Sequence, residues 1–302
     1  MRPNFLNPGD TIGLVTTARR TTPDVVERAE AMLTSWGLNV RKTESLISSE
    51  HSYHGASVET RAGDLQTLLD DPQVKAVMCA RGGYGSSQIL DMVKWDEFKK
   101  NPKWIVGFSD VTALHLQAYR LGVESIHSLM PLQFKDEKQK PAYDRLKKIL
   151  FGDVVPLSWS TGAGSRAGEC TGHLVGGNLS LITDALATTN ELHTFGTILF
   201  LEEVDEPFYK VDKMLTHLKR AKKLDKIKGL VVGYFTDIKD TDIPYGETVE
   251  EIILSKIPTT IPVAFGCPSG HQAPNMPWIH GAQVKLHVDE SGSSIDFLPA
   301  SA

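Results

Sequence analysis

Residues 74–122 read VKAVMCARGGYGSSQILDMVKWDEFKKNPKWIVGFSDVTALHLQAYRLG, and this stretch decides the fold. It contains two short apolar runs, at 74–80 and 103–108, and each is followed by a segment with apolar residues at helical spacing. Short apolar strands that alternate with helices are typical of a parallel sheet covered by helices on both faces. The stretch therefore predicts an α/β fold.

The same alternation continues outward from this stretch. Toward the N-terminus, strands are predicted over 11–18 and 38–46, with helices over 23–37 and 56–71. In the second half, buried strands are predicted over 197–204 and 229–235, with a helix over 211–221 between them. A further strand is expected at 262–266, and residues 282–298 predict a hairpin that turns at 290–294.

A boundary between two domains is expected where this pattern weakens, between about residues 136 and 166. The Gly/Ser-rich stretch STGAGSRAG at 160–168 is the best candidate for a linker. We therefore expect an N-terminal α/β domain over residues 1–160 and a C-terminal domain over residues 167–302. A chain of 302 residues is long enough for two such domains.

Net charge, apolar segments and cysteine content indicate which partners and which cellular location to expect. A net charge of −5 does not suggest binding to the phosphate backbone of a nucleic acid. The N-terminal segment lacks the apolar run of a signal peptide, and no stretch approaches the length of a membrane span. The three cysteines are odd in number and widely spaced, which fits a reducing compartment. The expected location is the cytoplasm.

A glycine-rich loop at residues 80–87, ARGGYGSS, follows one of the predicted strands. Its glycines allow the backbone to approach a ligand and to aim N–H groups at an anion. The spacing fits neither a dinucleotide-binding fingerprint nor a Walker A loop. A plain strand-to-helix turn remains an equally good interpretation of this loop alone.

A second loop, Gly107-Phe108-Ser109-Asp110, lies between a predicted strand and an amphipathic helix. A serine on a sharp turn of this kind exposes its hydroxyl, as in a nucleophile elbow. The closing glycine of G-x-S-x-G is absent, because Val111 occupies that position. On the local sequence alone, an N-cap role for Ser109 or Asp110 is favoured over a catalytic one.

A third loop, residues 266–271, carries His271 in a Gly/Pro-rich setting beyond a strand. Only suitable partners would make this histidine a general base rather than a structural residue. Glu202 and Glu203, at the end of the strand predicted over 197–204, are candidates to orient it. Because alternate residues of a strand face opposite sides, we expect one of the two carboxylates to serve the site and the other to be solvated or ion-paired. Together these groups would form a Ser-Glu-His triad.

Other chemistries have weaker support. No H-E-x-x-H, C-x-x-C or close His/Asp cluster suggests a metal, and no cofactor is expected. Cys267 lies near His271, but its apolar surroundings favour a buried structural thiol. Two further classes stay open: a peptide- or anion-binding protein without catalysis, and a nucleotide-using α/β enzyme.

The segments ARGGYGSSQIL, VGFSDVTALHLQ, VGGNLSLI, LFLEEVDEPFYKVDKML and GCPSGHQAPNMPW, taken together, resemble the LD-carboxypeptidases of peptidase family S66, which also contains the microcin C immunity hydrolases. The resemblance covers nearly the whole chain. It implies an N-terminal flavodoxin-like parallel sheet with helices on both faces, and a smaller C-terminal swivelling, β-rich α/β domain. It also implies a homodimer.

The same resemblance implies roles for individual residues. Ser109 is the expected nucleophile, His271 the general base and Glu202 the orienting acid, with Glu203 as the fallback. The backbone N–H groups of Gly83 and Asp110 form the expected oxyanion hole. A carboxypeptidase must also hold a free carboxylate, and loop position and charge make Arg81 and the N–H groups near Ser86 and Ser87 the candidates for it. Asn178 is expected to contact the peptide.

The implied reaction is metal-independent hydrolysis of the bond between an L-centre and a terminal D-amino acid. The typical substrate is a murein tetrapeptide, which loses D-Ala during cell-wall recycling. The alternative is an immunity-type amidase that acts on aminoacyl-nucleotide conjugates. That branch is expected to carry an added loop with an aromatic residue that stacks on the base, and Trp159 is the nearest equivalent in this chain.

Overall fold

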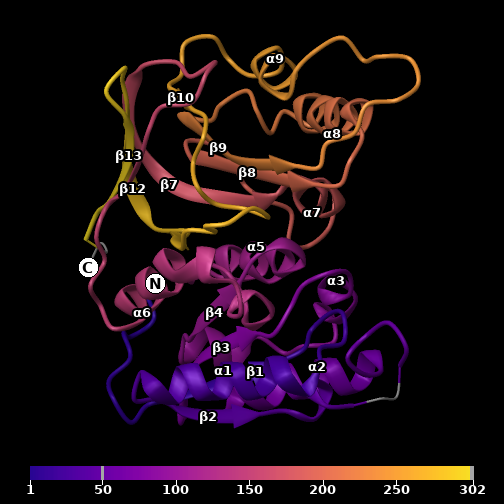
Figure 1. The fold of residues 1–302 in the computed structure, drawn as a ribbon, viewed down its shortest axis with the longest axis vertical. Helices are drawn as coiled ribbons and strands as arrows, with labels where there is room; N and C mark the ends of the chain where they lie inside the picture. The colour runs from indigo at the N-terminus through magenta and orange to yellow at the C-terminus, as the bar shows by residue number, and fades with distance from the viewer. Residues whose placement is uncertain (49–50, 300–302) are drawn as a thin grey trace. The chain divides into compact units, whose positions relative to one another are not determined.

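The computed structural model describes residues 1–48 and 51–299 and divides the chain into two compact units (Figure 1). The first unit contains residues 1–154 and 276–279, and the second contains residues 155–275 and the chain from residue 280. The expected division, 1–160 and 167–302, therefore differs in two ways. It places the boundary several residues too late, and it misses a short segment that returns to the first unit.

The first unit contains a six-stranded sheet in the order β11-β5-β4-β3-β1-β2. The pairs β1–β2, β1–β3, β3–β4 and β4–β5 are all parallel. The order 2-1-3-4-5 is that of flavodoxin, so the expected flavodoxin-like sheet is confirmed. Its strands are β1 (Thr11–Val15), β2 (Asn39–Lys42), β3 (Val74–Cys79), β4 (Trp104–Gly107), β5 (Ser125–His127) and β11 (Trp278–His280).

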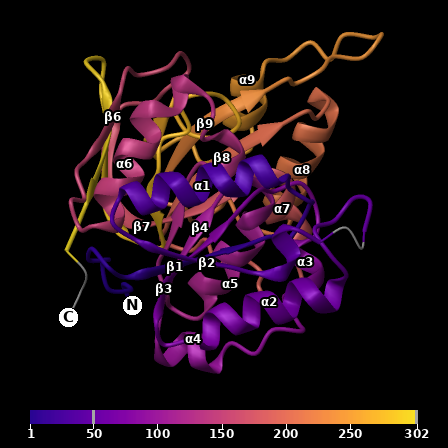
Figure 2. The ribbon, with the colours of Figure 1, turned by 60° about the horizontal axis from the view of Figure 1, so that its bottom comes forward.

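Helices cover this sheet on both faces. Right-handed crossovers in opposite directions place α1 and α2 on opposite sides of β1, as Figure 2 shows. The helices of the unit are α1 (Pro23–Ser35), α2 (Val58–Asp70), α3 (Ser86–Ile89), α4 (Asp96–Lys100), α5 (Thr112–Arg120) and α6 (Lys140–Leu150). Four short 3₁₀ helices join them: η1 (Glu44–Leu46), η2 (Ser109–Val111), η3 (Pro131–Gln133) and η4 (Glu137–Gln139).

Both indole rings of the first sheet lie in its core. Trp104 on β4 and Trp278 on β11 are fully buried. The ring of Trp278 stacks on His127 of β5, with ring centroids 4.9 Å apart. Burial of this aromatic anchor explains why a segment so late in the sequence completes the sheet of the first unit.

The second unit contains a mixed seven-stranded sheet in the order β10-β9-β8-β7-β12-β13-β6, and Figure 1 shows β7, β8 and β9 side by side. The first four strands are parallel, whereas β7, β12, β13 and β6 pair in antiparallel fashion. The strands are β6 (Leu157–Trp159), β7 (Gly168–Asn178), β8 (Ile198–Val204), β9 (Gly229–Thr236), β10 (Val263–Ala264), β12 (Gln283–Val288) and β13 (Ser293–Phe297). The helices are α7 (Leu179–Asp184), α8 (Phe208–Arg220) and α9 (Val249–Leu254). The predicted C-terminal hairpin is confirmed as β12–β13.

The Gly/Ser-rich stretch at 160–168 is not a linker. Gly162 N–H donates to the carbonyl of Phe265 at 3.1 Å, and Arg166 exchanges backbone hydrogen bonds with Val263 at 2.8 and 3.0 Å. The Arg166 side chain also donates to the carbonyls of Pro258 and Ile261. Residues that are poor in apolar side chains are thus held in the second unit by their backbone groups.

Strand β7 is the longest strand in the described part of the chain, and sequence patterning missed it because glycines interrupt it. A Cβ built on Gly176 would lie 2.0 Å from the carbonyl oxygen of Phe200 on β8. Only glycine permits this approach of the two strands.

None of the helices in the described ranges, 1–48 and 51–299, has the length and apolar character needed to cross a membrane.

Candidate active site

Ser109 occupies a strained turn directly after β4. Its φ is +61°, a left-handed conformation that costs a non-glycine residue about 1–2 kcal/mol. Phe108 before it is extended, and the chain then enters η2 and α5. This is the strand–turn–helix geometry of a nucleophile elbow. Neither η2 nor α5 is capped by a side chain, so the interpretation of Ser109 or Asp110 as an N-cap is wrong.

The turn is anchored through the carbonyl of Gly107. This oxygen accepts a hydrogen bond from Ser128 N–H at 2.9 Å and lies 2.8 Å from Nε2 of His115. His115 is fully buried, and burial lowers its pKa to about 4. The imidazole is therefore neutral near pH 7, and its contact with the Gly107 carbonyl helps to hold the turn in place.

The glycine-rich loop lies against this turn within the first unit. A Cβ built on Gly82 would lie 3.3 Å from Cβ of Ser109 and 3.4 Å from the backbone nitrogen of Asp110. Gly83 follows at a positive φ of +116°. The two expected oxyanion donors, Gly83 and Asp110, thus belong to segments in mutual contact.

Asp110 holds the two loops together with its side chain. Its Oδ2 accepts a hydrogen bond from Ser86 N–H at 2.9 Å, and the Ser86 hydroxyl lies 2.8 Å from that of Thr17. Burial raises the pKa of Asp110, against the opposing effect of these hydrogen bonds. Ser86 is fully buried. Its N–H and hydroxyl are engaged inside the protein, so Ser86 supports the loop instead of offering these groups to a ligand.

Arg61 of α2 completes this support. Its side chain is fully buried, and its guanidinium donates to the carbonyls of Thr17 (2.6 Å), Gly85 (3.0 Å) and Ala56 (3.3 Å). A fourth hydrogen bond, of 2.9 Å, reaches the side chain of Gln88. One cation therefore fixes the end of β1, the segment before α2 and the glycine-rich loop.

Arg61→Met is expected to lower the free energy of unfolding by about 3 kcal/mol, because it leaves three buried carbonyl groups without their donor. Chemical denaturation measures this loss. The matched control is Arg28→Met on α1, where the arginine forms an exposed i,i+4 ion pair with Asp24 and the expected loss is about 0.5 kcal/mol or less. Equal losses for the two variants would show that the buried hydrogen bonds of Arg61 contribute no more to the free energy of unfolding than the exposed ion pair of Arg28.

Glu202 and His271 form a hydrogen-bonded pair in the second unit. Glu202 lies near the end of β8 and is fully buried, and its Oε2 is 2.7 Å from Nδ1 of His271. The His271 side chain keeps 18% of its surface exposed. Because Nδ1 faces the carboxylate, Nε2 is the ring nitrogen that could exchange a proton with a substrate or nucleophile.

The carboxylate of Glu202 changes the basicity of His271. Burial by itself lowers the pKa of the imidazole, but the charge of Glu202 and the hydrogen bond between the two groups outweigh it. The pKa of His271 is therefore raised above its ordinary value of 6.5. A histidine held in this way is a stronger base.

Glu203 contacts a different set of groups. Its carboxylate accepts hydrogen bonds from Nδ2 of Asn178 (2.9 Å) and from the N–H (2.7 Å) and hydroxyl (2.8 Å) of Ser180. The expectation that one of the two carboxylates would be solvated or ion-paired is wrong, because Glu203 is also buried and is held by neutral donors. Burial raises the pKa of Glu203.

Asn178 has a structural role in this arrangement. It is the N-cap of α7, and its Oδ1 accepts a hydrogen bond from Leu181 N–H at 3.3 Å. Together with its bond to Glu203, this explains why the side chain is 3% exposed. The expected contact of Asn178 with a peptide stays a prediction.

The loop before His271 is held by a residue that sequence inspection did not single out, Asn275. Its Oδ1 accepts hydrogen bonds from Gly270 N–H (2.9 Å) and the Ser269 hydroxyl (3.2 Å). A Cβ on Gly270 would lie 3.1 Å from Oε2 of Glu202, so glycine is required where the loop passes the carboxylate. Cys267 in the same loop is fully buried, as expected of a structural thiol.

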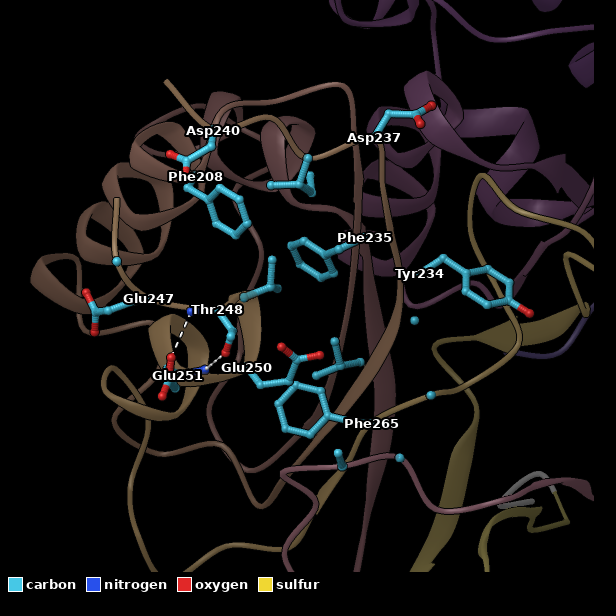
Figure 3. Close-up of a pocket in the computed structure, with 18 of the residues that line it drawn as sticks. Phe208, Tyr234, Phe235, Asp237, Asp240, Glu247, Thr248, Glu250, Glu251 and Phe265 are labelled. Atoms are coloured by element: carbon cyan, nitrogen blue, oxygen red, sulfur yellow. Dashed lines mark hydrogen bonds between the residues drawn. The ribbon is translucent and has the colours of Figure 1, made fainter. Parts of the chain in front are cut away.

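A cavity of about 830 Å³ also lies in the second unit (Figure 3). It is bounded by aromatic rings, including Phe208, Phe235 and Phe265, and by the carboxylates of Glu247 and Glu250. Tyr234 also borders it, but the ring of Tyr234 points away from the rings of the three phenylalanines. No serine, cysteine or histidine occurs among its described lining residues, so the cavity supplies neither a serine or cysteine nucleophile nor an imidazole base.

The candidate residues fall into two groups. Ser109, Asp110, Gly83, Ser86 and Arg81 belong to the first unit, and Glu202, His271 and Asn178 belong to the second. Across residues 1–48 and 51–299, no group of three or more His, Cys, Asp or Glu side chains is arranged to hold a metal ion.

Several curated proteins are similar to the chain over nearly its full length. A probable murein peptide carboxypeptidase of Bacillus subtilis is 29% identical over 98% of this chain and 94% of that protein. A putative carboxypeptidase of Synechocystis is 30% identical, with coverage of 99% and 97%. The murein tetrapeptide carboxypeptidase of Pseudomonas aeruginosa is 28% identical, with coverage of 91% and 92%.

Solved structures share the fold. The muramoyltetrapeptide carboxypeptidase from Oxalobacter formigenes matches with a TM-score of 0.86 and 24% identity, over 96% of this chain and 100% of that one. The protein MccF in complex with glutamyl sulfamoyl guanosine matches with a TM-score of 0.87 and 20% identity, over 99% of both chains.

The models of the LD-carboxypeptidase N-terminal and C-terminal domains match residues 12–128 and 171–286. These two matches cover most of the chain, and their division agrees with a two-domain organisation. This protein therefore belongs to the LD-carboxypeptidase family, peptidase family S66, and is a hydrolase of the peptidase type.

Proposed function

We propose that the protein is a serine carboxypeptidase that releases terminal D-Ala from murein tetrapeptides. The observation that carries the proposal is the 2.7 Å hydrogen bond between Nδ1 of His271 and the buried carboxylate of Glu202. A histidine oriented by a carboxylate is the base that activates a serine nucleophile. The strained turn at Ser109 supplies a suitable serine. Two of the similar proteins are named as a probable murein peptide carboxypeptidase and a murein tetrapeptide carboxypeptidase.

The chemistry proceeds in two steps. Ser109 Oγ attacks the carbonyl of the L-centre while His271 Nε2 takes the hydroxyl proton, and the N–H groups of Gly83 and Asp110 stabilise the oxyanion. The imidazolium then returns its proton to the leaving amine, so that D-Ala departs and an acyl-serine remains. Water, deprotonated by the same histidine, hydrolyses this ester. The mechanism requires Ser109 Oγ and His271 Nε2 to meet in the active enzyme.

Arg81 is a candidate to bind the free carboxylate of the substrate. It begins the glycine-rich loop, and its guanidinium donates through Nη1 to the carbonyl of Arg20 at 3.0 Å. That bond fixes one end of the guanidinium and leaves the other nitrogens as donors for an anion. Ser86 is not included, because its polar groups are already engaged.

The alternative function is an amidase that acts on aminoacyl-nucleotide conjugates. The fold shared with MccF, whose solved complex contains glutamyl sulfamoyl guanosine, favours it. Trp159, the candidate base-stacking residue, lies on β6 and donates its indole N–H to the carbonyl of Phe265 at 3.0 Å. An indole tied down in a strand is less suited to stacking than one on a mobile loop.

The deciding experiment compares two substrates. The purified protein is expected to release D-Ala from murein tetrapeptide, with and without EDTA, and to leave glutamyl sulfamoyl guanosine intact. Chromatography of the products measures both reactions. Hydrolysis of the nucleotide conjugate alone would select the amidase function, and loss of D-Ala release with EDTA would contradict metal-independent catalysis. Hydrolysis of neither substrate would contradict both proposals.

We also propose that the protein acts in the cytoplasm and forms a homodimer. Cys79, Cys170 and Cys267 form no disulfide with one another, which fits a reducing compartment. Burial raises the pKa of Cys79 to about 12 and that of Cys170 to about 11, so neither is a reactive thiolate near pH 7.

A further inference from the structure

A second arginine lies against the glycine that is proposed as an oxyanion donor. A Cβ built on Gly83 would lie 2.9 Å from Cβ and 3.0 Å from Cδ of Arg19. The aliphatic part of Arg19 therefore runs along Gly83, in the segment that follows β1. No sequence pattern singled out Arg19, because this contact joins residues that are far apart in the chain.

The guanidinium of Arg19 has no carboxylate partner among residues 1–48 and 51–299. Its central carbon lies 5.1 Å from the centroid of the Tyr53 ring, a cation–π contact that orients the group without neutralising it. Arg81 has no acidic partner in the described part of the chain either, and its buried Nε lacks a hydrogen bond there. Two guanidiniums thus lie beside one glycine loop, and neither is paired with a carboxylate of residues 1–48 or 51–299.

The two cations repel each other. Burial lowers the pKa of Arg81, and the charge of Arg19 lowers it further. An anion bound between them would relieve this repulsion and accept charge-assisted hydrogen bonds from planar donors. The guanidiniums of Arg19 and Arg81 are therefore complementary in charge and in hydrogen bonding to a carboxylate.

Arg19 packs on Gly83, the proposed oxyanion donor, and this position suits a cation that binds the carboxylate of a C-terminal residue. In a peptide that ends in D-Ala, the carboxylate carbon lies only about 3–4 Å from the scissile carbonyl carbon. If the carbonyl oxygen accepts a hydrogen bond from Gly83 N–H, the carboxylate must lie close to Gly83 as well. Arg19 is the exposed cation that packs on this glycine.

We propose that Arg19 binds the C-terminal carboxylate of the substrate and thereby restricts the enzyme to the terminal peptide bond. Tyr53 holds the guanidinium in place, and Arg81, tied to the carbonyl of Arg20, supplies the second positive charge. This inference rests on the proposed function, because it takes the reacting bond to lie beside Gly83.

The test uses two substrates that differ only in the anion: a murein tetrapeptide ending in D-Ala and the same peptide ending in D-alaninamide. For the acid, Arg19→Gln is expected to lower kcat/KM by about 10- to 100-fold. For the amide, the change is expected to stay within about threefold. Arg19→Lys is expected to retain an intermediate preference for the acid, because it keeps the charge but not the planar donors.

The matched control is Arg20→Gln, which removes the same charge from the adjacent exposed residue while retaining the carbonyl that Arg81 uses. It is expected to leave the preference for the acid unchanged. The inference is overturned if Arg19→Gln keeps the wild-type preference, or if it lowers both rates equally, as a structural defect would. A wild-type protein that releases no D-Ala overturns the proposed function itself, and the inference with it.

Discussion

Replacing Ser109 with alanine is expected to lower kcat/KM for D-Ala release by at least about a thousandfold. The proposed reaction passes through an acyl-serine. Without the hydroxyl, the only proposed catalytic groups left are the N–H donors of Gly83 and Asp110 and the His271–Glu202 pair. Steady-state assays on purified murein tetrapeptide measure the loss. Ser35→Ala, which changes an exposed serine at the end of α1, is the control and should retain wild-type activity.

The strained turn provides a second readout for the same residue. Ser109→Gly should be as inactive as Ser109→Ala, yet more stable than it by up to about 1 kcal/mol, because glycine adopts a φ of +61° without steric cost. Chemical denaturation compares the two variants. Retention of more than about a tenth of the activity by either variant would contradict Ser109 as the nucleophile. Equal stability would show that the turn stores no strain.

Glu202→Gln is expected to lower kcat/KM by about a thousandfold to ten-thousandfold, although the side chain keeps its shape. An amide cannot stabilise the imidazolium that forms when His271 takes the serine proton. It also removes the charge that holds the pKa of His271 above 6.5. The same assay measures the loss, and the pH dependence of the residual activity reports the change in pKa.

The direction of the pH effect follows from the role of His271 as a base. The imidazole must be neutral to act, so wild-type kcat/KM should fall as the pH drops through a pKa that lies above 6.5. In Glu202→Gln, burial then acts without the opposing charge, and the acid limb should move to lower pH.

Glu203→Gln is the matched comparison, since this carboxylate lies one residue further along β8 and contacts Asn178 and Ser180 instead. It should shift the acid limb far less than Glu202→Gln does. A larger shift or a larger loss of activity for Glu203→Gln would reverse the assignment of the two carboxylates.

Much of the fold could be predicted from periodicity alone. The apolar runs around 11–15, 74–79 and 104–107 are short and nearly continuous, because strands buried on both faces leave no side for polar residues. The strands β12 and β13 show the opposite pattern, alternation around a turn, which predicts an antiparallel hairpin. Both signals are local in the sequence, so no knowledge of the tertiary structure was needed.

Other elements escaped prediction because their stability comes from distant partners. Strand β7 contains glycines that weaken a local strand signal, yet the close approach of β8 requires them. Strand β11 is too short to be recognised, and it completes the first sheet because Trp278 stacks on His127. The stretch at 160–168 has the composition of a linker, but its backbone pairs with residues near 263–265.

The candidate site, like the fold, could be predicted from the sequence only in part. By itself, the sequence determined the alternation that predicts a parallel α/β sheet, the serine in a turn after a strand, and a histidine and two glutamates in the second half. Only the tertiary structure decided that Glu202 is the carboxylate that bonds His271, that Ser86 and Asn178 are occupied within the protein, and that Arg19 packs on Gly83. The physical reason is that periodicity reports which side of an element is buried, whereas hydrogen bonds and charge pairs depend on distances between residues that only folding brings together.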